Sequence, residues 1–241
     1  MVTIIIPSRN EQYTAKTVKD LLAKATGDIE IYIILDGWWL KPEDYNKDPR
    51  VNYIHYSKAR GMRNAINSGV SLSRGDYIMK TDAHCMFDKG FDEKLVADCE
   101  KNWIVIPRRY PLDPEKWVIE ERTDAKYPID VMNLDENLQG KQTTERKDNS
   151  LIRTPSFQGS CWFMRKDYFH ELELMDEDRF GGFWQEAQEM GIKCQQNGGM
   201  VMRNTKTWYA HWHKTKGRGY SLNKDQNKTR KEIKELYVNN R

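Results

Sequence analysis

The sequence predicts a single α/β domain built on a mostly parallel β-sheet that carries helices on both faces. Short apolar runs rich in β-branched residues alternate with segments of helical periodicity along the first 110 residues. Strands that are apolar throughout are buried on both faces, which is typical of parallel sheets. The 241 residues are enough for a substantial core, and their 38% hydrophobic and 11% aromatic content excludes a disordered chain.

The first strand and helix open the chain. Residues 2–7 form an apolar run, and the polar residues 8–11 follow it. A helical pattern comes next, in which four apolar residues share one face: Val18, Leu21, Leu22 and Ala25. We therefore expect a strand, a polar loop and a helix in this order.

The next elements repeat this alternation. Residues 29–35 have the pattern of a second buried strand that ends at Asp36, and residues 51–56 that of a third, shorter one. Residues 59–72 have the pattern of a helix. Asp36 thus stands at the carboxyl end of a strand, where parallel sheets bind ligands.

A fourth predicted strand, at residues 75–81, leads into Asp82 and His84. Side chains two positions apart point to the same side of an extended segment, so both can reach one ion or one phosphate group. The alternative is that Asp82 caps the following turn and His84 is a half-buried polar residue, which is the commoner role of an isolated Asp-x-His motif. Their place at the carboxyl end of a strand favours the metal site.

The second half of the chain is less regular. We expect a helix at residues 92–101 and a strand at residues 103–107. Residues 111–157 contain four prolines and dense charge, and they predict only a helix around residues 114–122. Beyond them the pattern predicts a strand, two helices and two short strands, at residues 159–165, 166–172, 186–196, 200–203 and 207–210.

The carboxyl-terminal residues 214–241 are basic, with nine Lys or Arg against three Asp or Glu, although the whole chain has a net charge of only +3. Such a tail attracts nucleic acid, anionic lipid or a diphosphate, and more often it is the solvated face of a helix. The sequence shows no leader, no apolar run long enough to span a membrane, and only four widely spaced cysteines. We therefore expect a cytoplasmic protein without a membrane span.

Five motifs occur in an order that is more specific than any one of them. They are Ile-Pro-Ser-Arg-Asn-Glu at residues 6–11, Asp36, Gly-Met-Arg-Asn-Ala at 61–65, Thr-Asp-Ala-His at 81–84, and Gly-Gly-Phe-Trp-Gln-Glu at 181–186 with Asn-Gly-Gly at 197–199. In this order they resemble the GT-A glycosyltransferases, a Rossmann-like fold. The Asp-x-His form and the downstream His211 are most similar to the polypeptide N-acetylgalactosaminyltransferases. The short chain is more similar to family 2 enzymes and their single-domain relatives in phage genomes.

The resemblance covers residues 2–110 and 158–213. It implies a metal-dependent hexosyltransferase that uses a nucleotide sugar, with a UDP-sugar as the implied donor. It also divides the chain into a nucleotide-sugar-binding half, an irregular insertion or lid, an acceptor-side half, and a basic loop with a terminal helix, at residues 1–110, 111–157, 158–213 and 214–241.

The same resemblance names the residues that would bind the nucleotide sugar. They are Pro7, Ser8, Arg9, Glu11, Asp36, Arg63, Asn64, Asp82, Lys214, Arg218 and Tyr220. Asp36 would accept a hydrogen bond from the base, and Arg63 and Asn64 would lie near ribose or phosphate. The cations of residues 214–220 would close over the diphosphate, unless this segment is only a flexible basic loop.

The resemblance further implies a divalent ion held by Asp82, His84 and His211. A cation that bridges two phosphates stabilises the charge of a leaving nucleoside diphosphate. Mixed carboxylate and imidazole ligands favour Mn²⁺, with Mg²⁺ as the alternative. If His211 binds the ion, His213 points to the same side and reaches phosphate or acceptor; otherwise residues 211–213 are an aromatic surface cluster.

Glu186 stands where the resemblance places the acidic residue beneath the acceptor, and Glu189 follows one turn later. A carboxylate there would take the proton of an acceptor hydroxyl, or it would merely complement the helix dipole. Trp184 and Gln185 replace small residues of the relatives' Trp-Gly-Gly-Glu-Asn motif. Together with His213, these two residues are the candidate acceptor contacts.

Several functions stay open on the sequence alone. The leading one is a glycosyltransferase that acts on a hydroxylated base in DNA or, alternatively, on a glycan, a lipid-linked acceptor or a protein. The same three ligands are also the two-histidine, one-carboxylate set of non-haem iron oxygenases, although the alternating β–α order argues against their β-barrel. A nucleic-acid-binding module based on the basic tail is the third class. The Asp-x-His resemblance implies a retaining reaction, whereas the family 2 resemblance and Glu186 imply an inverting one.

Overall fold

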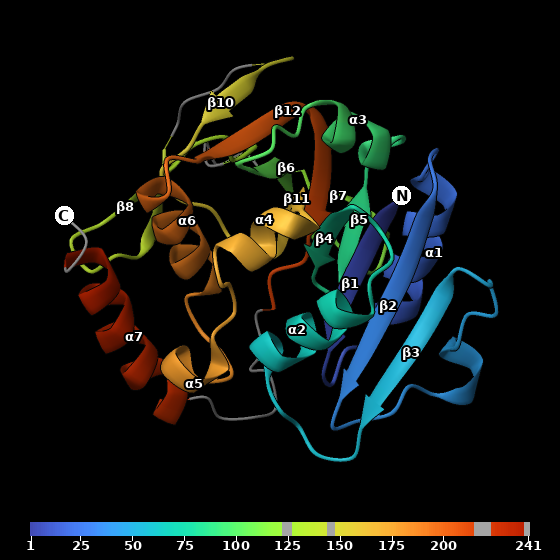
Figure 1. Ribbon diagram of the computed structural model, residues 1–241. Coiled ribbons are helices and arrows are strands. Elements are labelled where there is room, and N and C mark those ends of the chain that lie inside the picture. Colours follow the sequence, from blue (N-terminus) through green and yellow to red (C-terminus); the bar gives the residue numbers. More distant parts are fainter. Residues whose placement is uncertain (122–126, 144–147, 215–222, 239–241) are drawn as a thin grey trace.

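The computed structural model describes residues 1–121, 127–143, 148–214 and 223–238. Within these residues a ten-stranded mixed sheet runs through the molecule (Figure 1), and eight of its strands follow one another in the order β10-β12-β6-β11-β4-β1-β2-β3. Its main strands are mostly parallel and alternate with helices along the chain. The predicted α/β class is therefore confirmed.

The amino-terminal half of the sheet is entirely parallel. It consists of β1 (Val2–Ser8), β2 (Ile29–Asp36), β3 (Val51–Tyr56) and β4 (Tyr77–Thr81). β1 lies between β2 and β4, and β3 pairs with the outer side of β2. Because these strands are parallel, Ser8, Asp36 and Asp82 emerge along one edge of the sheet.

The carboxyl-terminal half of the sheet is mixed. β6 (Trp103–Asp113) and β12 (Met200–His211) are parallel, while β11 (Cys161–Arg165) runs antiparallel between β4 and β6. Short strands extend this half: β5 (Cys85–Phe87) and β10 (Leu151–Arg153) pair with β12, and β7 (Val118–Ile119) pairs with β6. A separate two-stranded sheet is formed by β8 (Met132–Leu134) and β9 (Gly140–Gln142).

Helices cover both faces because the strands alternate their apolar side chains between the faces. Ile4 and Ile6 of β1 belong to the core beneath α1 (Thr14–Lys24) and α3 (Phe91–Ala97). Ile5 belongs to the opposite core, which is covered by α2 (Met62–Leu72), α4 (Lys166–Glu171) and α6 (Glu186–Gln196) (Figure 1). The prediction of helices on both faces is confirmed.

A third apolar cluster attaches the last helix. α7 (Asn223–Val238) packs against α6 and α5 (Glu177–Phe180) through five buried residues: Leu138, Phe180, Ile192, Ile233 and Leu236. Arg179 also pairs with Glu232 across this contact at 3.1 Å. None of the helices in the described segments combines the length and the apolar composition that crossing a membrane requires.

The predicted helix around residues 114–122 is wrong. Its described part, residues 114–121, forms a turn and β7 instead. The Asp113 carboxylate accepts hydrogen bonds from the backbone N–H groups of Glu115 and Lys116, each at 3.0 Å, and Trp117 has a φ of 58°. This side-chain-capped turn reverses the chain, so that β7 pairs back on β6.

The largest differences between predicted and observed element ends lie in β6, β12 and α3. β6 continues to Asp113, six residues beyond its expected end, because β12 runs beside it through residue 211. The strands expected at 200–203 and 207–210 are the single strand β12, whose register shifts between Asn204 and Trp208. Helix α3 ends at Ala97, before the expected residue 101.

Candidate metal and nucleotide-sugar site

Three segments that are far apart in the sequence meet at the carboxyl edge of the sheet. Asp82 follows β4, and its backbone N–H donates to the Ser160 carbonyl at 2.9 Å. His84 precedes β5, which pairs antiparallel with the end of β12 and sets His211 opposite Cys85. Strand pairing therefore places His84 beside His211, although 127 residues separate them.

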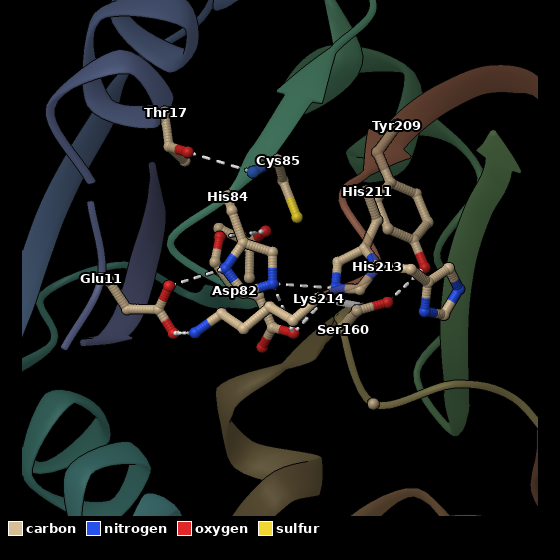
Figure 2. Close-up of polar contacts among 12 residues, drawn as sticks. Glu11, Thr17, Asp82, His84, Cys85, Ser160, Tyr209, His211, His213 and Lys214 are labelled. Carbon is tan, nitrogen blue, oxygen red and sulfur yellow. Dashed lines mark hydrogen bonds and ion pairs between the residues drawn. The ribbon is translucent and has the colours of Figure 1, made fainter. Parts of the chain in front are cut away.

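The side chains of Asp82, His84 and His211, here named the metal cluster, point toward one another (Figure 2). His211 Nε2 lies 3.1 Å from both His84 Nε2 and Asp82 Oδ2, and His84 Nε2 lies 3.8 Å from Asp82 Oδ2. Ligand atoms that share one ion at ~2.0–2.2 Å lie roughly 3 to 4 Å apart, so these separations fit a common ion. The structure thus brings together the three residues predicted as metal ligands, and two imidazoles with a carboxylate suit Mn²⁺.

Asp82 is ionised in this setting. Burial raises its pKa, but the Lys80 ammonium and the hydrogen bond with His211 outweigh burial and hold the pKa of Asp82 well below its usual range. Lys80 is itself buried, forms an ion pair with Asp82 and donates to the Gly159 carbonyl at 2.7 Å. The cluster therefore contains a carboxylate in the anionic form that metal binding needs.

His211 is neutral at pH 7. Burial holds its pKa well below the usual value, and the hydrogen bond with Asp82 offsets this only in part. Behind the ring, the fully buried Arg109 places one guanidinium nitrogen 3.4 Å from His211 Nδ1, and the same nitrogen contacts His213. A neutral imidazole is the form that ligates metals.

Glu11 bridges His84 and Lys214 (Figure 2). Its Oε2 lies 2.9 Å from His84 Nδ1, and its Oε1 accepts a hydrogen bond from Lys214 Nζ at 2.5 Å. A carboxylate on Nδ1 fixes the ring so that Nε2 faces the metal cluster. We expected Glu11 to line the nucleotide pocket; the structure places it behind a metal ligand and against the first cation of the basic segment.

A cavity of about 360 Å³ opens beside the metal cluster. Asp82, His211 and His213 are among its lining residues, as are residues 183–188. Met132, Gln139 and Gln158, which also line it, come from or directly follow the segment without clear sequence pattern. That segment therefore contributes residues to the lining of the cavity.

The two candidate bases lie in different environments. Glu186 lines the cavity and accepts a hydrogen bond from the Trp184 backbone N–H at 2.9 Å. Glu189 is fully buried and pairs with Arg63 at 3.1 Å and with Lys193 at 3.0 Å. Of the two, Glu186 is the carboxylate that reaches the cavity.

Arg63 and Asn64 hold the loop that leads into α6, residues 181–185, here named the α6 entry loop. Arg63 is fully buried and donates to the carbonyls of Gly181 at 3.2 Å and Trp184 at 3.0 Å. Asn64 donates to Glu177 just before the loop at 2.9 Å. We expected both residues near ribose or phosphate; in the structure the Arg63 guanidinium and the Asn64 side-chain NH2 group bind protein groups instead.

Asp36 is fixed by the backbone of the segment that follows β3. Its two carboxylate oxygens accept hydrogen bonds from the N–H groups of Arg60 at 2.6 Å and Gly61 at 3.1 Å. At the end of β1, the Ser8 carbonyl accepts a hydrogen bond from the Trp38 indole at 2.6 Å. Backbone and side-chain hydrogen bonds thus hold the ends of β1 and β2 at the edge predicted to receive the nucleotide base.

Other predicted residues flank these groups. Pro7 and Arg9 are half-buried on either side of Ser8. Arg218 and Tyr220, predicted to contact the diphosphate, lie outside the residues that the structure describes.

Sequence reasoning missed Lys80 and Arg109. Both are buried within strands and contact the metal cluster or its neighbour His213. A lysine in the apolar strand Tyr77–Thr81 was the available signal, because a charge in a buried strand needs a partner.

The comparison with protein families decides the membership of the chain. The family model of glycosyl transferase family 2 matches residues 3–173. The chain belongs to glycosyl transferase family 2. Family and fold together overturn the iron-oxygenase alternative, since the scaffold is a mostly parallel sheet and not a β-barrel.

Curated relatives of this family 2 protein are polypeptide N-acetylgalactosaminyltransferases. Polypeptide N-acetylgalactosaminyltransferase 3 of Taeniopygia guttata is 27% identical over 163 residues, which cover 63% of this chain and 26% of the relative. Probable N-acetylgalactosaminyltransferase 7 of Caenorhabditis elegans is 23% identical over 224 residues, which cover 83% of this chain and 37% of the relative. The chain thus spans well under half the length of these relatives.

Solved structures show that the family 2 protein has the GT-A fold. The crystal structure of GalNAc-T7 with UDP, GalNAc and Mn²⁺ covers 98% of this chain and 48% of that chain, with a TM-score of 0.81 and 18% identity. The crystal structure of S. aureus TarS 1-349 in complex with UDP-GlcNAc covers 99% of this chain and 66% of that chain, with a TM-score of 0.66 and 11% identity.

Proposed function

We propose that this protein transfers a sugar from a UDP-sugar to a hydroxyl acceptor and that the reaction depends on a divalent ion. The observation that carries the proposal is the metal cluster at the carboxyl edge of the sheet, beside a cavity large enough for a small molecule. Family membership supports it, as do the similar crystal structures that were solved with UDP and Mn²⁺ or with UDP-GlcNAc.

Asp82, His84 and His211 would hold the ion, with Mn²⁺ favoured over Mg²⁺ by the two imidazoles. When bound, such an ion stabilises the negative charge that the diphosphate gains as the bond to the sugar breaks. Lys214 contacts Glu11, which in turn contacts His84 of the metal cluster. Its ammonium group would therefore also bind the same phosphates.

The nucleotide would lie along the edge formed by β1 and β2. Asp36 would accept a hydrogen bond from the base, because each carboxylate oxygen keeps a second lone pair beyond its bond to a backbone N–H. Pro7, Ser8 and Arg9 would border the same pocket. The backbone contacts of Asp36 would keep its position unchanged on binding.

Glu186 would remove the proton of the acceptor hydroxyl. It lines the cavity together with Asp82 and His211, and the Trp184 N–H holds one of its oxygens. Replacing Glu186 by Gln is expected to lower kcat about 10²- to 10⁴-fold with the UDP affinity unchanged. A base in this role implies inversion, so the anomeric proton of the product, measured by NMR, should report the opposite configuration to the donor.

Calorimetric titration with UDP in the presence and absence of MnCl₂ tests the function as a whole. We expect UDP binding that requires Mn²⁺, and hydrolysis or transfer of a UDP-sugar under the same conditions. Absence of UDP affinity with Mn²⁺ present would overturn the proposal.

A hydroxylated base in DNA is the acceptor that a specific observation favours. α7 exposes the side chains of Lys228, Arg230, Lys231 and Lys234. The Arg230 guanidinium lies 6.0 Å from the ring of Trp184, which lines the cavity, so one cation of this helix lies beside the cavity. Phosphate contacts of this kind would give affinity for DNA.

Salt dependence separates DNA from the glycan, lipid-linked and protein acceptors. If four phosphates are contacted, transfer to DNA that contains a hydroxymethylated pyrimidine should fall on the order of 100-fold between about 50 and 200 mM salt. A rate of transfer to this DNA that does not change with salt concentration would contradict the DNA acceptor. Activity on a neutral oligosaccharide but not on this DNA would contradict it as well. Neither result would contradict the transferase function.

A further inference from the structure

The α6 entry loop contains two residues in a backbone conformation that side chains rarely adopt. Trp184 has a φ of 103° and Gln185 a φ of 56°. Glycine adopts such angles without steric cost, whereas residues with a Cβ are strained there. Gln185 is also the N-cap of α6 but makes no capping hydrogen bond, although short polar residues that cap are preferred there. Two local rules are therefore broken at adjacent positions.

The surroundings hold the loop in this conformation from two sides. On one side, Arg63 donates to the carbonyls of Gly181 and Trp184 at 3.2 and 3.0 Å. On the other, the hydroxyl of Thr229 in α7 donates to the Phe180 carbonyl at 2.5 Å. Strain that is imposed by surrounding contacts in this way is typical of functional sites.

Both strained residues carry a buried polar atom without a partner. The indole Nε1 of Trp184 and the amide Oε1 of Gln185 are buried, and neither has a hydrogen-bond partner in the described parts of the chain. Gln185 is only 7% exposed, and its amide nitrogen makes one long contact of 3.4 Å with the Leu138 carbonyl. A buried donor and a buried acceptor left without partners destabilise the free protein.

The two side chains line the same cavity as the metal cluster. Asp82 and His211 are lining residues as well, and the diphosphate would bind at these ligands. A sugar attached to the second phosphate would therefore enter this cavity. Sugar hydroxyl groups both donate and accept hydrogen bonds, so they complement an indole that only donates and an amide oxygen that only accepts.

We infer that Trp184 and Gln185 are specificity-determining residues that hydrogen-bond to the sugar of the nucleotide-sugar donor, an inference that rests on the proposed function. The strained backbone directs both side chains to the cavity, and the sugar supplies the partners that the unliganded protein lacks. The same hydrogen bonds select among donor sugars, because a sugar with a different hydroxyl arrangement leaves one of these groups unpaired.

The inference makes a joint prediction about binding and stability. Trp184→Phe removes the unpartnered N–H and keeps a ring, and Gln185→Gly removes the side chain and relieves the positive φ. Each variant should bind UDP as the wild type does and bind the preferred UDP-sugar about 3- to 10-fold more weakly. Each should also have an equal or higher Tm.

The measurements are titrations with MnCl₂ and either UDP or a panel of UDP-glucose, UDP-galactose and their N-acetylated counterparts, together with thermal unfolding. Glu173→Gly is the matched control. Glu173 has a φ of 48° but is exposed and does not line the cavity. This variant should not lower the Tm and should leave all affinities unchanged.

The outcomes are distinct. If both variants keep the wild-type order of affinities for the four UDP-sugars, the inference is overturned and the transferase function is not. Unchanged UDP-sugar affinity with a raised KM for the acceptor assigns the two side chains to the acceptor and overturns the donor assignment. A lower Tm with unchanged affinities shows a purely structural role. A wild-type protein that binds no UDP overturns the proposed function and the inference with it.

Discussion

The metal cluster and the α6 entry loop border one cavity, yet they satisfy their polar groups in opposite ways. Asp82 and His84 have partners in Lys80 and Glu11, and regular strand pairing sets their positions. The α6 entry loop has positive φ angles at Trp184 and Gln185 and two buried polar atoms without partners in the described chain. Under the proposed function, the cation site is formed before a ligand binds, whereas the ligand would supply the missing hydrogen-bond partners of the loop.

Of the changes to these two regions, removal of a metal ligand should have the largest effect. Asp82→Asn is expected to weaken Mn²⁺ binding by more than about 100-fold, since loss of a residue that only hydrogen-bonds to a metal ligand already costs about 10- to 100-fold. Calorimetry with MnCl₂ measures this directly. Asp76→Asn, at an exposed position, is the control. Retained Mn²⁺ affinity in the Asp82 variant would contradict the metal cluster.

The next largest effect concerns the support of the α6 entry loop. Arg63→Met leaves Glu189 buried with Lys193 as its remaining ion-pair partner and removes two hydrogen bonds to loop carbonyls. We expect the free energy of unfolding in urea to fall by about 3–5 kcal/mol. Arg165→Met, which breaks a surface pair with Asp167, should change it little. A loss as small as that of the control would show that Arg63 does not hold the loop.

A smaller effect is expected behind the metal cluster. Glu11→Gln removes the negative charge that faces His84 Nδ1 and that pairs with Lys214. The change should weaken Mn²⁺ binding about 10- to 100-fold. Mn²⁺ electron paramagnetic resonance counts the free ion. Glu93→Gln, which alters an exposed carboxylate bonded to Thr26, serves as the comparison. Equal affinities in the two variants would mean that Glu11 plays no part in orienting His84.

The smallest effect tests the contact between α7 and the loop. Thr229→Val keeps the shape of the side chain and removes its hydrogen bond to the Phe180 carbonyl. The expected loss of stability is about 0.5–1.5 kcal/mol, measured in urea. Ser71→Ala, at an exposed helix end, should cost less. A loss no larger than that of the control would show that this hydrogen bond does not hold α7 against the end of α5.

The sequence was sufficient to predict the regular, amino-terminal half of the sheet and the metal cluster. Apolar runs placed β1, β2 and β4, and the i, i+2 spacing of Asp82 and His84 together with a downstream His211 predicted the metal cluster. These features depend on local periodicity and on strand order, both of which are visible in one dimension.

The irregular features depended on contacts that periodicity does not encode. Glu11 meets His84 across 73 residues, and Arg63 meets Glu189 across 126. Nothing in the residue types at 184 and 185 signals a positive φ, because Trp and Gln are not the residues that such turns usually contain. Surrounding contacts, and not local propensity, set that conformation.

The pairing of β5 with the end of β12 has a consequence for folding. Asp82 and His211 lie 129 positions apart in the chain, so an ion shared by them would act as a removable cross-link between the end of β4 and the end of β12. Closing so long a segment restricts the unfolded chain more than the folded one. Mn²⁺ should therefore raise the unfolding temperature, and a chelator should reverse that increase.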